Sequence, residues 1–392
     1  MTLRIAIDIT RLVDRFLQRR LPTGVDRVSL AYVNHYAHSA RAVVRWHGVS
    51  FVLSESASRK LFGRLLNDQH RFDSGYYYEI IMGVIDGWHH RDIHNYILLN
   101  TGHTGLESKD YPAMLQKLGV KPVFFVHDLI PITHPEFCRV GEVQKHKTRI
   151  NNMLDCAVGI IANSSATYED LRSYCNTRTS VLPKTISAPL APAKLTTEVQ
   201  PRPIDKPFFI MLGTIEPRKN HLLILHVWRR LIEHLGNRAP QLILVGRRGW
   251  ESEQVFNILD RSTLLRPFVT ELNDCSDLEL AAYFQHAQAL LFPSWVEGFG
   301  MPLVEALSVG LPVLASNLPV FHEVAGDVPD YIEPHDGAGW FNALTDYLSE
   351  TTERRSAQLL RMSKFSATGW SEHFAAVDLL LGEIDSCDDV LK

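Results

Sequence analysis

The sequence predicts an α/β protein built from two doubly wound domains, and three observations support this fold class. Short apolar runs rich in β-branched residues alternate with stretches of helical period, which is typical of parallel sheets with crossover helices. The alternation occurs twice, on either side of a proline-rich stretch. A chain of 392 residues with 45% hydrophobic content is also long enough to bury two cores.

The first series of strands is expected in the N-terminal half of the chain. The opening residues alternate apolar side chains with charged ones, so they indicate a strand rather than the apolar stretch of a signal peptide. We assign residues 1–195 to this first domain. Its expected strands are 4–9, 43–46, 96–99, 123–126 and 157–162.

A second domain follows the proline-rich segment 189–207, which has no helical or strand period and is expected to be a linker. We assign residues 196–371 to the second domain and residues 372–392 to a C-terminal helix, whose candidate docking partner is the first domain. Two such sheets place ligands at the carboxyl ends of their strands. The expected strands are 208–212, 242–245, 289–292 and 313–315, and the expected helices lie near 221–235, 277–286 and 302–309.

Composition bounds the compartment and the partners. The five cysteines are odd in number and scattered, which suits a reducing compartment, and we expect a cytoplasmic protein. No uninterrupted apolar run approaches the ~18 residues of a membrane helix. Residues 1–195 hold 24 Lys and Arg against 17 Asp and Glu, whereas residues 196–392 hold 16 against 27. A basic N-terminal half is compatible with peripheral contact with the inner membrane face, or with ordinary solvated charge.

The strongest local motif, SWVEGFGMPLVEAL, follows the predicted strand 289–292. Gly298 and Gly300 let the backbone approach a ligand, and Pro302 suits the first turn of a helix. The free amides at such a helix start bind anions, a diphosphate among them. The alternative is a glycine-rich turn without a ligand.

Two glutamates of this motif are spaced for two different contacts. Glu297 precedes the helix start and Glu305 lies two turns further on. One carboxylate can therefore reach a sugar while the other reaches a ribose. Two solvated glutamates would have the same spacing.

A second motif, GTIEPRKNH, lies at the turn after the predicted strand 208–212. Two adjacent cations at such a turn can neutralise a nucleotide diphosphate, Arg218 as a fork donor and Lys219 as a point charge. The alternative for Arg218 is an ion pair with Glu216 that fixes the turn.

Together these motifs resemble the large retaining glycosyltransferase family conventionally numbered four, of the two-Rossmann (GT-B) architecture. The seven residues between Glu297 and Glu305 match the family signature, and GTIEPRKN matches its phosphate-binding turn. The likeness extends more weakly from the turn at Thr23 and Gly24 to Trp370. It implies two Rossmann-like doubly wound domains facing each other across a cleft.

The resemblance also implies roles for residues of the second domain. Lys219 and Arg218 would bind the donor diphosphate, Glu297 the transferred sugar and Glu305 the nucleotide ribose. Thr214 of the phosphate-binding turn and Arg247, after the strand 242–245, would add to the donor site. Residues 272–275 would lie near the base, although this part departs from the family pattern. The amides that complete the phosphate and sugar contacts belong to Gly298, Phe299, Gly300 and Met301.

In the first domain the resemblance singles out a histidine and a glycine. His127 follows the predicted strand 123–126, where family members carry a histidine that faces the donor sugar and the acceptor, and we assign it a catalytic role. A structural histidine is the alternative. Gly24, in the sequence PTGVDR, resembles a glycine loop that closes on the donor, although Thr23 is equally suited to cap a helix. The basic stretch 14–21 is compatible with a lipid-linked acceptor or with a solvated loop.

The sequences GTIEPRKN and HDLIPITHPEF look closest to bacterial mannosyltransferases of surface polysaccharide assembly. We therefore expect a hexosyltransferase with GDP-mannose as donor and a glycan or lipid-diphosphate-linked acceptor, while UDP-glucose, UDP-amino sugars and deoxysugar donors stay open. No Asp-x-Asp is present, so we expect metal independence. We also expect no resident cofactor and no nucleic-acid partner. Retention of the anomeric configuration would follow a front-face route, in which the leaving phosphate accepts the proton of the acceptor hydroxyl.

Three other functions make different demands on the sequence or on the activity. A nicotinamide oxidoreductase would need a glycine fingerprint after the first strand, and IDITR offers none. A sugar-nucleotide epimerase of the same architecture would convert the donor without an acceptor. A sugar-nucleotide-binding scaffold subunit would bind without turnover, and the combination of His127, Lys219, Glu297 and Glu305 weighs against it.

Overall fold

The computed structural model describes residues 3–18, 22–46, 49–67, 82–83, 92–349 and 351–386. The chain forms two compact units, and each is described by itself. Unit 1 comprises Met1–Ile132, Gly141–Leu190 and Trp370–Lys392. Unit 2 comprises Thr133–Val140 and Ala191–Gly369.

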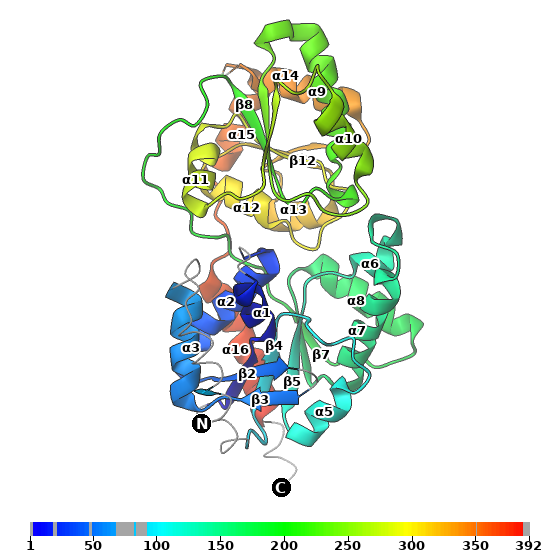
Figure 1. Ribbon diagram of the computed structural model, residues 1–392, viewed down its shortest axis with the longest axis vertical. Helices are drawn as coiled ribbons and strands as arrows, with labels where there is room; N and C mark the ends of the chain where they lie inside the picture. The colour runs from blue at the N-terminus through cyan, green and yellow to red at the C-terminus, as the bar shows by residue number, and fades with distance from the viewer. Residues whose placement is uncertain are drawn as a thin grey trace. The chain divides into compact units, whose positions relative to one another are not determined.

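Unit 1 contains a seven-stranded sheet in the order β3-β2-β1-β4-β5-β6-β7 (Figure 1). The pairs are parallel except that β3 runs antiparallel to β2. The central strands are continuous apolar runs because helices cover both faces of a parallel sheet. The strands are β1 (Ile5–Asp8), β2 (Arg41–Trp46), β3 (Val49–Val52), β4 (Ile97–Asn100), β5 (Lys121–Val126), β6 (Gly159–Ala162) and β7 (Lys184–Ser187).

The described helices of unit 1 connect these strands, and the last one comes from the C-terminal end of the chain. They are α1 (Thr10–Leu17), α2 (Gly24–Tyr36), α3 (Glu55–Asn67), α5 (Tyr111–Leu118), α6 (Ile130–Thr133), α7 (Glu142–Cys156), α8 (Ser165–Thr177) and α16 (Trp370–Ser386). Helix α16 packs on α2, where the Tyr36 hydroxyl donates to Asp378 at 2.6 Å and the Tyr32 hydroxyl lies 2.9 Å from His373 Nε2. The C-terminal helix is thus held by buried aromatic and polar contacts of unit 1.

Unit 2 contains a six-stranded, fully parallel sheet in the order β10-β9-β8-β11-β12-β13 (Figure 1). Its strands are β8 (Phe208–Leu212), β9 (Gln241–Val245), β10 (Val269–Leu272), β11 (Leu290–Phe292), β12 (Val313–Ser316) and β13 (Asp330–Ile332). Its α-helices are α9 (His221–Leu235), α10 (Glu253–Arg261), α11 (Asp277–His286), α12 (Met301–Ser308), α13 (Pro319–Ala325), α14 (Gly337–Tyr347) and α15 (Glu353–Met362). Trp228 of α9 and Trp340 of α14 are fully buried in its core.

The predicted α/β fold class with two Rossmann-like doubly wound domains is confirmed. Residues 188–207 contain no helix or strand, as expected of a linker. The sequence did not indicate four strands, and these are the edge strands of the two sheets: β3, β7, β10 and β13. The arrangement of the two domains across a cleft stays a prediction.

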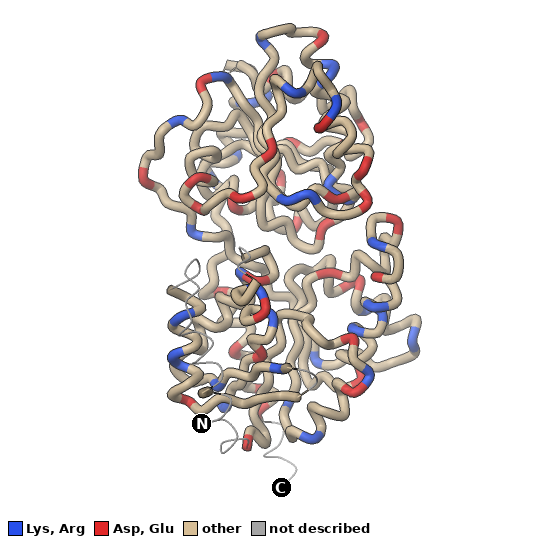
Figure 2. The backbone as a smooth tube through the Cα atoms, viewed as in Figure 1, with Lys and Arg blue, Asp and Glu red and all other residues tan. Residues whose placement is uncertain are grey.

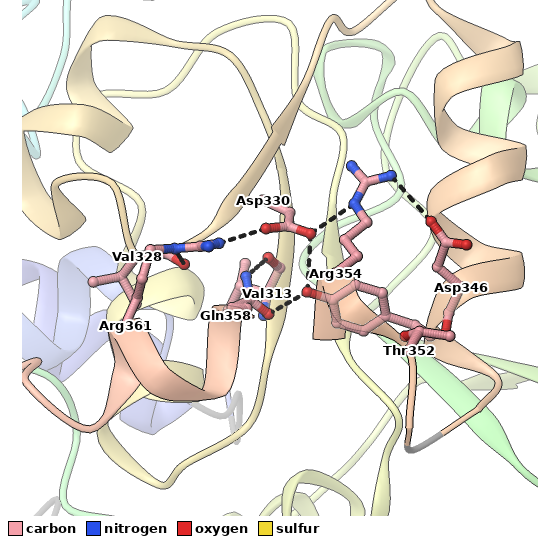
Figure 3. Close-up of polar contacts among 9 residues, drawn as sticks. Val313, Val328, Asp330, Asp346, Thr352, Arg354, Gln358 and Arg361 are labelled. Atoms are coloured by element: carbon pink, nitrogen blue, oxygen red, sulfur yellow. Dashed lines mark hydrogen bonds and ion pairs between the residues drawn. The ribbon is translucent and has the colours of Figure 1, made fainter. Parts of the chain in front are cut away.

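A polar network fixes α15 to the β12–β13 side of the sheet in unit 2 (Figure 3). Asp330 of β13 accepts from Arg354 at 2.7 Å and from Arg361 at 2.5 Å. The fully buried Gln358 side chain donates to the Val313 carbonyl at 2.7 Å and accepts from the Val313 amide at 3.1 Å. These contacts involve the amino-terminal residues of β12 and β13, so the network is structural and lies away from the carboxyl edge discussed below.

Charged side chains are spread along both units. Lys and Arg as well as Asp and Glu occur along the described tube of each unit in the view of Figure 2. Residues 19–21 of the basic stretch 14–21, and Cys387, lie outside the described residues. Of the helices that the structure describes, none combines the length and apolar character needed to cross a bilayer. Membrane contact stays a prediction.

Candidate active site

Two turns meet at the carboxyl edge of the sheet in unit 2. Strands β8 and β11 are parallel neighbours, so the turns that follow them leave the sheet on the same side. The Trp295 amide donates to the Arg218 carbonyl at 2.8 Å, and the Asn220 side chain donates to the carbonyls of Pro293 and Pro334 at 3.2 and 2.7 Å. Asn220 adopts φ 58°, a left-handed conformation that asparagine tolerates. These hydrogen bonds therefore hold the two predicted motifs side by side.

A cluster of four charged side chains lies where these turns meet. Lys219 Nζ lies 2.5 Å from one oxygen of Glu297, and Arg218 Nη1 lies 2.6 Å from the other. Arg218 Nε is 2.6 Å from Glu216, and the Ser294 hydroxyl donates to Glu297 at 2.8 Å. Lys219, Glu216 and Glu297 are buried. Arg218 thus makes the predicted alternative pair with Glu216 and a second pair with Glu297.

The electrostatics of the cluster keep Glu297 ionised. Burial raises the pKa of Glu297, but the charges of Arg218 and Lys219 and the hydrogen bonds from Lys219 and Ser294 outweigh it, and the pKa falls to about 2. Burial lowers the pKa of Lys219, and Glu297 opposes that shift. The sheet edge therefore carries a buried carboxylate whose charge depends on two adjacent cations.

Helix α12 begins next to this cluster. Gly300 lies at its N-cap with φ 102°, and a Cβ there would lie 2.8 Å from Phe321 Cε1, so only glycine fits. Of its neighbours, Phe299 is buried, Met301 opens the helix, and Gly298 lies between Glu297 and Phe299. The first-turn amides of such a helix point at an anion. Glu305 is buried on the same helix.

The remaining donor residues predicted in unit 2 lie at the same edge of the sheet. Thr214 is half-buried in the turn after β8, and the next residue, Ile215, bridges to Arg248 beside β9. Arg247 follows β9 and pairs with Asp274 at 2.6 Å, with 49% and 72% of the two side chains exposed. The sequence did not indicate this partner of Arg247.

In unit 1, His127 follows β5 at the carboxyl edge of the other sheet. It is buried, and its Nε2–H donates to the Thr101 carbonyl at 2.8 Å. Burial lowers the pKa of His127 more than its carbonyl partner raises it. Because Nε2 carries the proton of a neutral ring, Nδ1 is left as the hydrogen-bond acceptor.

Two further histidines near His127 were missed by sequence reasoning. The ring centroid of His103 lies 5.0 Å from that of His127 and 6.4 Å from that of His146. Each donates through Nε2 to a backbone carbonyl, His103 to Phe125 at 2.7 Å and His146 to Asp128 at 3.2 Å. Their positions after β4 and on α7 are separated in the sequence, so no local motif signals them.

The predicted glycine Gly24 is the first residue of α2. A Cβ built there would meet no protein atom within 4 Å. The preceding Thr23 caps the helix together with Asp26, whose carboxylate accepts from the Thr23 amide at 2.7 Å. The predicted helix cap is therefore present, and contact between Gly24 and a donor stays a prediction.

The structure brings together Lys219, Arg218, Glu297 and the start of α12, and it places His127 and Gly24 in unit 1. The ligand contacts of all predicted site residues stay predictions.

Comparison with known proteins finds similarity to glycosyltransferases. Residues 195–357 match the model of the family Glycosyl transferases group 1. The Serotype-specific mannosyltransferase WbdA of Escherichia coli is 27% identical over 256 residues, which cover 60% of this chain and 31% of WbdA. The O-antigen chain mannosyltransferase B of Escherichia coli is 30% identical over 217 residues, which cover 54% of this chain and 56% of the relative. The aligned part thus spans less than two thirds of either relative.

Solved structures resemble nearly the whole chain. The sucrose-phosphate synthase from Thermosynechococcus elongatus superposes with a TM-score of 0.65 at 14% identity, over 98% of this chain and 100% of that one. Anabaena HepE, solved in complex with UDP, gives a TM-score of 0.63 at 13% identity, over 97% and 99% of the two chains. At these identities the likeness concerns the fold alone. The resemblance drawn from the motifs is confirmed: residues 195–357 match the family Glycosyl transferases group 1, and the chain has the GT-B fold and is similar to O-antigen mannosyltransferases.

Proposed function

We propose that this protein is a retaining glycosyltransferase that moves mannose from GDP-mannose to a glycan or lipid-linked acceptor during surface polysaccharide assembly. One observation carries the proposal: the buried cluster of Lys219, Arg218 and Glu297 adjoins the start of α12 at one sheet edge. The family match and the mannosyltransferase relatives support the same activity.

The donor diphosphate would bind to Lys219, Arg218 and the first amides of α12. Two cations and two carboxylates balance one another in the cluster, so the amides supply attraction that no side chain cancels. A diphosphate that approaches Lys219 competes with Glu297 for the same ammonium. Binding would therefore free one Glu297 oxygen to contact the transferred sugar.

The transfer breaks the bond between the anomeric carbon and the phosphate oxygen of GDP, and forms a bond between that carbon and an acceptor hydroxyl oxygen. The departing phosphate oxygen receives the electron pair of the broken bond and then the proton of the acceptor hydroxyl. Lys219 and Arg218 stabilise the charge that grows on the leaving group, and the Glu297 carboxylate stabilises the positive charge on the sugar. His127 would accept a hydrogen bond from the sugar through Nδ1.

Metal independence belongs to the proposal. Lys219, Arg218 and the α12 amides together supply the positive potential that a divalent cation gives in other phosphate sites. A chelator should therefore leave turnover unchanged.

The experiment is a thermal-shift panel with GDP, UDP, ADP and dTDP, each with and without chelator, because a ligand that binds the folded state raises the melting temperature. We expect a shift with GDP alone that chelator leaves intact. Candidate acceptors are then assayed with GDP-mannose, and the anomeric configuration of the product is read by NMR. A shift with UDP or dTDP alone would exclude GDP-mannose as the donor. A product with the opposite anomeric configuration to the donor would exclude a retaining mechanism.

Two rival functions are separated by the same assay. An epimerase would convert the donor sugar in the absence of any acceptor. A scaffold subunit would bind GDP without transferring or converting the sugar.

A further inference from the structure

Two histidines at the carboxyl edge of the sheet in unit 1 make a reciprocal pair of hydrogen bonds. His127 follows β5, and its Nε2–H donates to the carbonyl of Thr101, which follows β4. His103 lies two residues after Thr101. Its Nε2–H donates to the carbonyl of Phe125 at 2.7 Å, and Phe125 lies two residues before His127. Each ring is therefore bonded to the backbone that leads to the other ring.

The reciprocal bonds fix the same tautomer in both rings. A carbonyl oxygen only accepts hydrogen bonds, so Nε2 carries the proton of each neutral ring and Nδ1 keeps its lone pair. Burial and the neighbouring rings of His127 and His146 hold the pKa of His103 well below its usual value, so this ring is neutral. Nδ1 of His103 has no hydrogen-bond partner among the described residues. The ring thus offers an acceptor and no free donor.

His103 is the most accessible of the three neighbouring histidines. His127 and His146 are 7% and 4% exposed, whereas His103 is half-buried. Its backbone has φ 59°, in the left-handed region that residues other than glycine seldom adopt. Such conformations are strained and cluster at functional sites. A strained residue therefore holds the most exposed ring of the group at the sheet edge.

An acceptor-only ring selects the chemistry of its ligand. A phosphate or a carboxylate needs donors, and the N–H groups of His103 and His127 are already bonded to carbonyls. A sugar hydroxyl can donate to a neutral ring nitrogen without the burial of a charge. The ring centroids lie 5.0 Å apart, so the ligands of the two rings are neighbours. Because the proposed function uses Nδ1 of His127 for the transferred sugar, Nδ1 of His103 is left for the other reactant.

We propose that His103 orients the acceptor sugar, because its Nδ1 accepts a hydrogen bond from one hydroxyl of that sugar. This inference rests on the proposed glycosyltransferase function. The hydroxyl that His103 holds is a neighbour of the attacking one, since the proton of the attacking hydroxyl goes to the departing phosphate oxygen. The ring takes up no proton in the reaction. His103 thus determines which face of the acceptor is presented to the donor.

Two substitutions separate the contact with a ligand from the contact with the backbone. In His103→Gln the longer amide reaches the Phe125 carbonyl with an N–H in place of Nε2–H, and no acceptor remains where Nδ1 lies. In His103→Asn the amide oxygen takes the place of Nδ1, and the side chain is too short to reach Phe125. Asparagine also tolerates the left-handed backbone. Sugar binding and stability should therefore respond to the two changes in opposite orders.

The test uses the full chain with saturating GDP, and its probes are the methyl glycosides of mannose, glucose, galactose and N-acetylglucosamine. Ligand-observed NMR should detect binding of at least one of them to the unmodified protein. His103→Gln should weaken that glycoside about tenfold, the size of one lost hydrogen bond, and His103→Asn less than about threefold. The melting temperature should fall further in His103→Asn than in His103→Gln.

His38→Gln is the matched control, because this histidine of unit 1 is exposed. It should change neither the glycoside affinity nor the melting temperature. The affinity for GDP should stay within about twofold in all three variants, since the nucleotide belongs to unit 2.

Three results would overturn the inference. No glycoside binds in the presence of GDP, or His103→Gln leaves glycoside binding unchanged, or His103→Asn weakens it as much as His103→Gln, which would assign the effect to the bond with Phe125. If His103→Gln does not fold, His103→Asn decides alone: retained glycoside binding supports the inference and a tenfold loss overturns it. Failure of the proposed function looks different, because GDP then does not bind whereas His103-dependent binding of the glycoside persists.

Discussion

The carboxyl edges of the two sheets manage charge in opposite ways. In unit 2, Glu297 is buried as an ion because Arg218 and Lys219 lie against it, and its pKa falls to about 2. In unit 1, burial lowers the pKa of His103 and His127, so these side chains are neutral rings held by backbone carbonyls. The turns after β8 and β11 hold a carboxylate by ion pairs, whereas the ends of β4 and β5 hold neutral histidines by backbone carbonyls. Such a division suits a reaction in which negative charge grows on a leaving diphosphate and the acceptor hydroxyl stays neutral until late.

The largest effect is expected from Lys219→Ala, which removes one of the two cations of the buried cluster. Glu297 would then be buried with one charged partner, and breaking such a pair costs about 3–5 kcal/mol of stability. GDP affinity should fall at least tenfold, because the diphosphate loses a point charge. Chemical denaturation and calorimetry measure the two quantities.

The control for that change is Lys364→Ala, which removes an exposed lysine of the same unit. It should alter neither stability nor GDP affinity. Equal effects of both substitutions would show that net charge, rather than the buried cluster, governs binding.

Glu297→Gln should separate turnover from binding. The amide keeps the shape and can still accept from Ser294, but it removes the charge that stabilises the sugar in the transition state, so turnover should fall by about 10²–10³. GDP affinity should rise, because Lys219 and Arg218 lose the carboxylate that competes with the diphosphate. Product formation and calorimetry test the two halves. Weaker binding of GDP would mean that Glu297 itself holds the nucleotide.

The sequence was sufficient for the fold where strands are central in their sheets. The runs that became β8 and β11 are apolar throughout because both of their faces are covered. Of the four missed strands, β7, β10 and β13 read KTIS, VTEL and DYI. They lie at sheet edges, where one side stays open to solvent and polar residues are accepted, so their hydrophobic signal is weak.

For the candidate site, the sequence predicted the charged residues themselves better than the residues that pair with them. Lys219 and Glu297 each lie in a glycine- or proline-marked turn after a strand, which local reading can detect. Asp274 became the partner of Arg247 only because β10 and β9 are neighbours in the sheet, so no spacing signals it. Ser294 lies three residues before Glu297 in the same turn, so its spacing could have been read from the sequence. Asp26 could have been found, since it lies three residues after Thr23 in a capping-box pattern.

Acid should weaken unit 1 before unit 2. Burial holds the pKa values of His103, His127 and His146 below the 6.5 of an unfolded histidine. The unfolded chain therefore binds protons first, and stability that is complete above pH 6.5 is lost as the pH falls, by about 1.4 kcal/mol per pH unit for each such histidine. In unit 2, His221 has its pKa lowered to about 3 by burial and Lys219 and adds one such group.

Hydrogen exchange between pH 7.5 and 5 measures this order, because it reports each unit separately. Peptides of unit 1 should lose protection more steeply than those of unit 2. The Glu297 cluster should persist in this range, since its lowered pKa removes stability only as the pH falls from about 4.5 toward 2. Equal loss in both units would contradict the contrast.

The smallest effect is expected from Arg247→Ala, which tests whether exposure separates this arginine from the buried cluster at the same edge. Arg247 is half exposed and pairs with Asp274, and surface ion pairs contribute about 0–1 kcal/mol. GDP affinity should therefore fall by no more than about fivefold. Asp274→Ala is the matched partner, since it removes the competing carboxylate and leaves Arg247 in place. A tenfold or larger loss of GDP affinity with Arg247→Ala, together with tighter GDP binding in Asp274→Ala, would place Arg247 in the donor site. The ion pairs that open for the ligand would then include the exposed pair as well as the buried cluster of unit 2.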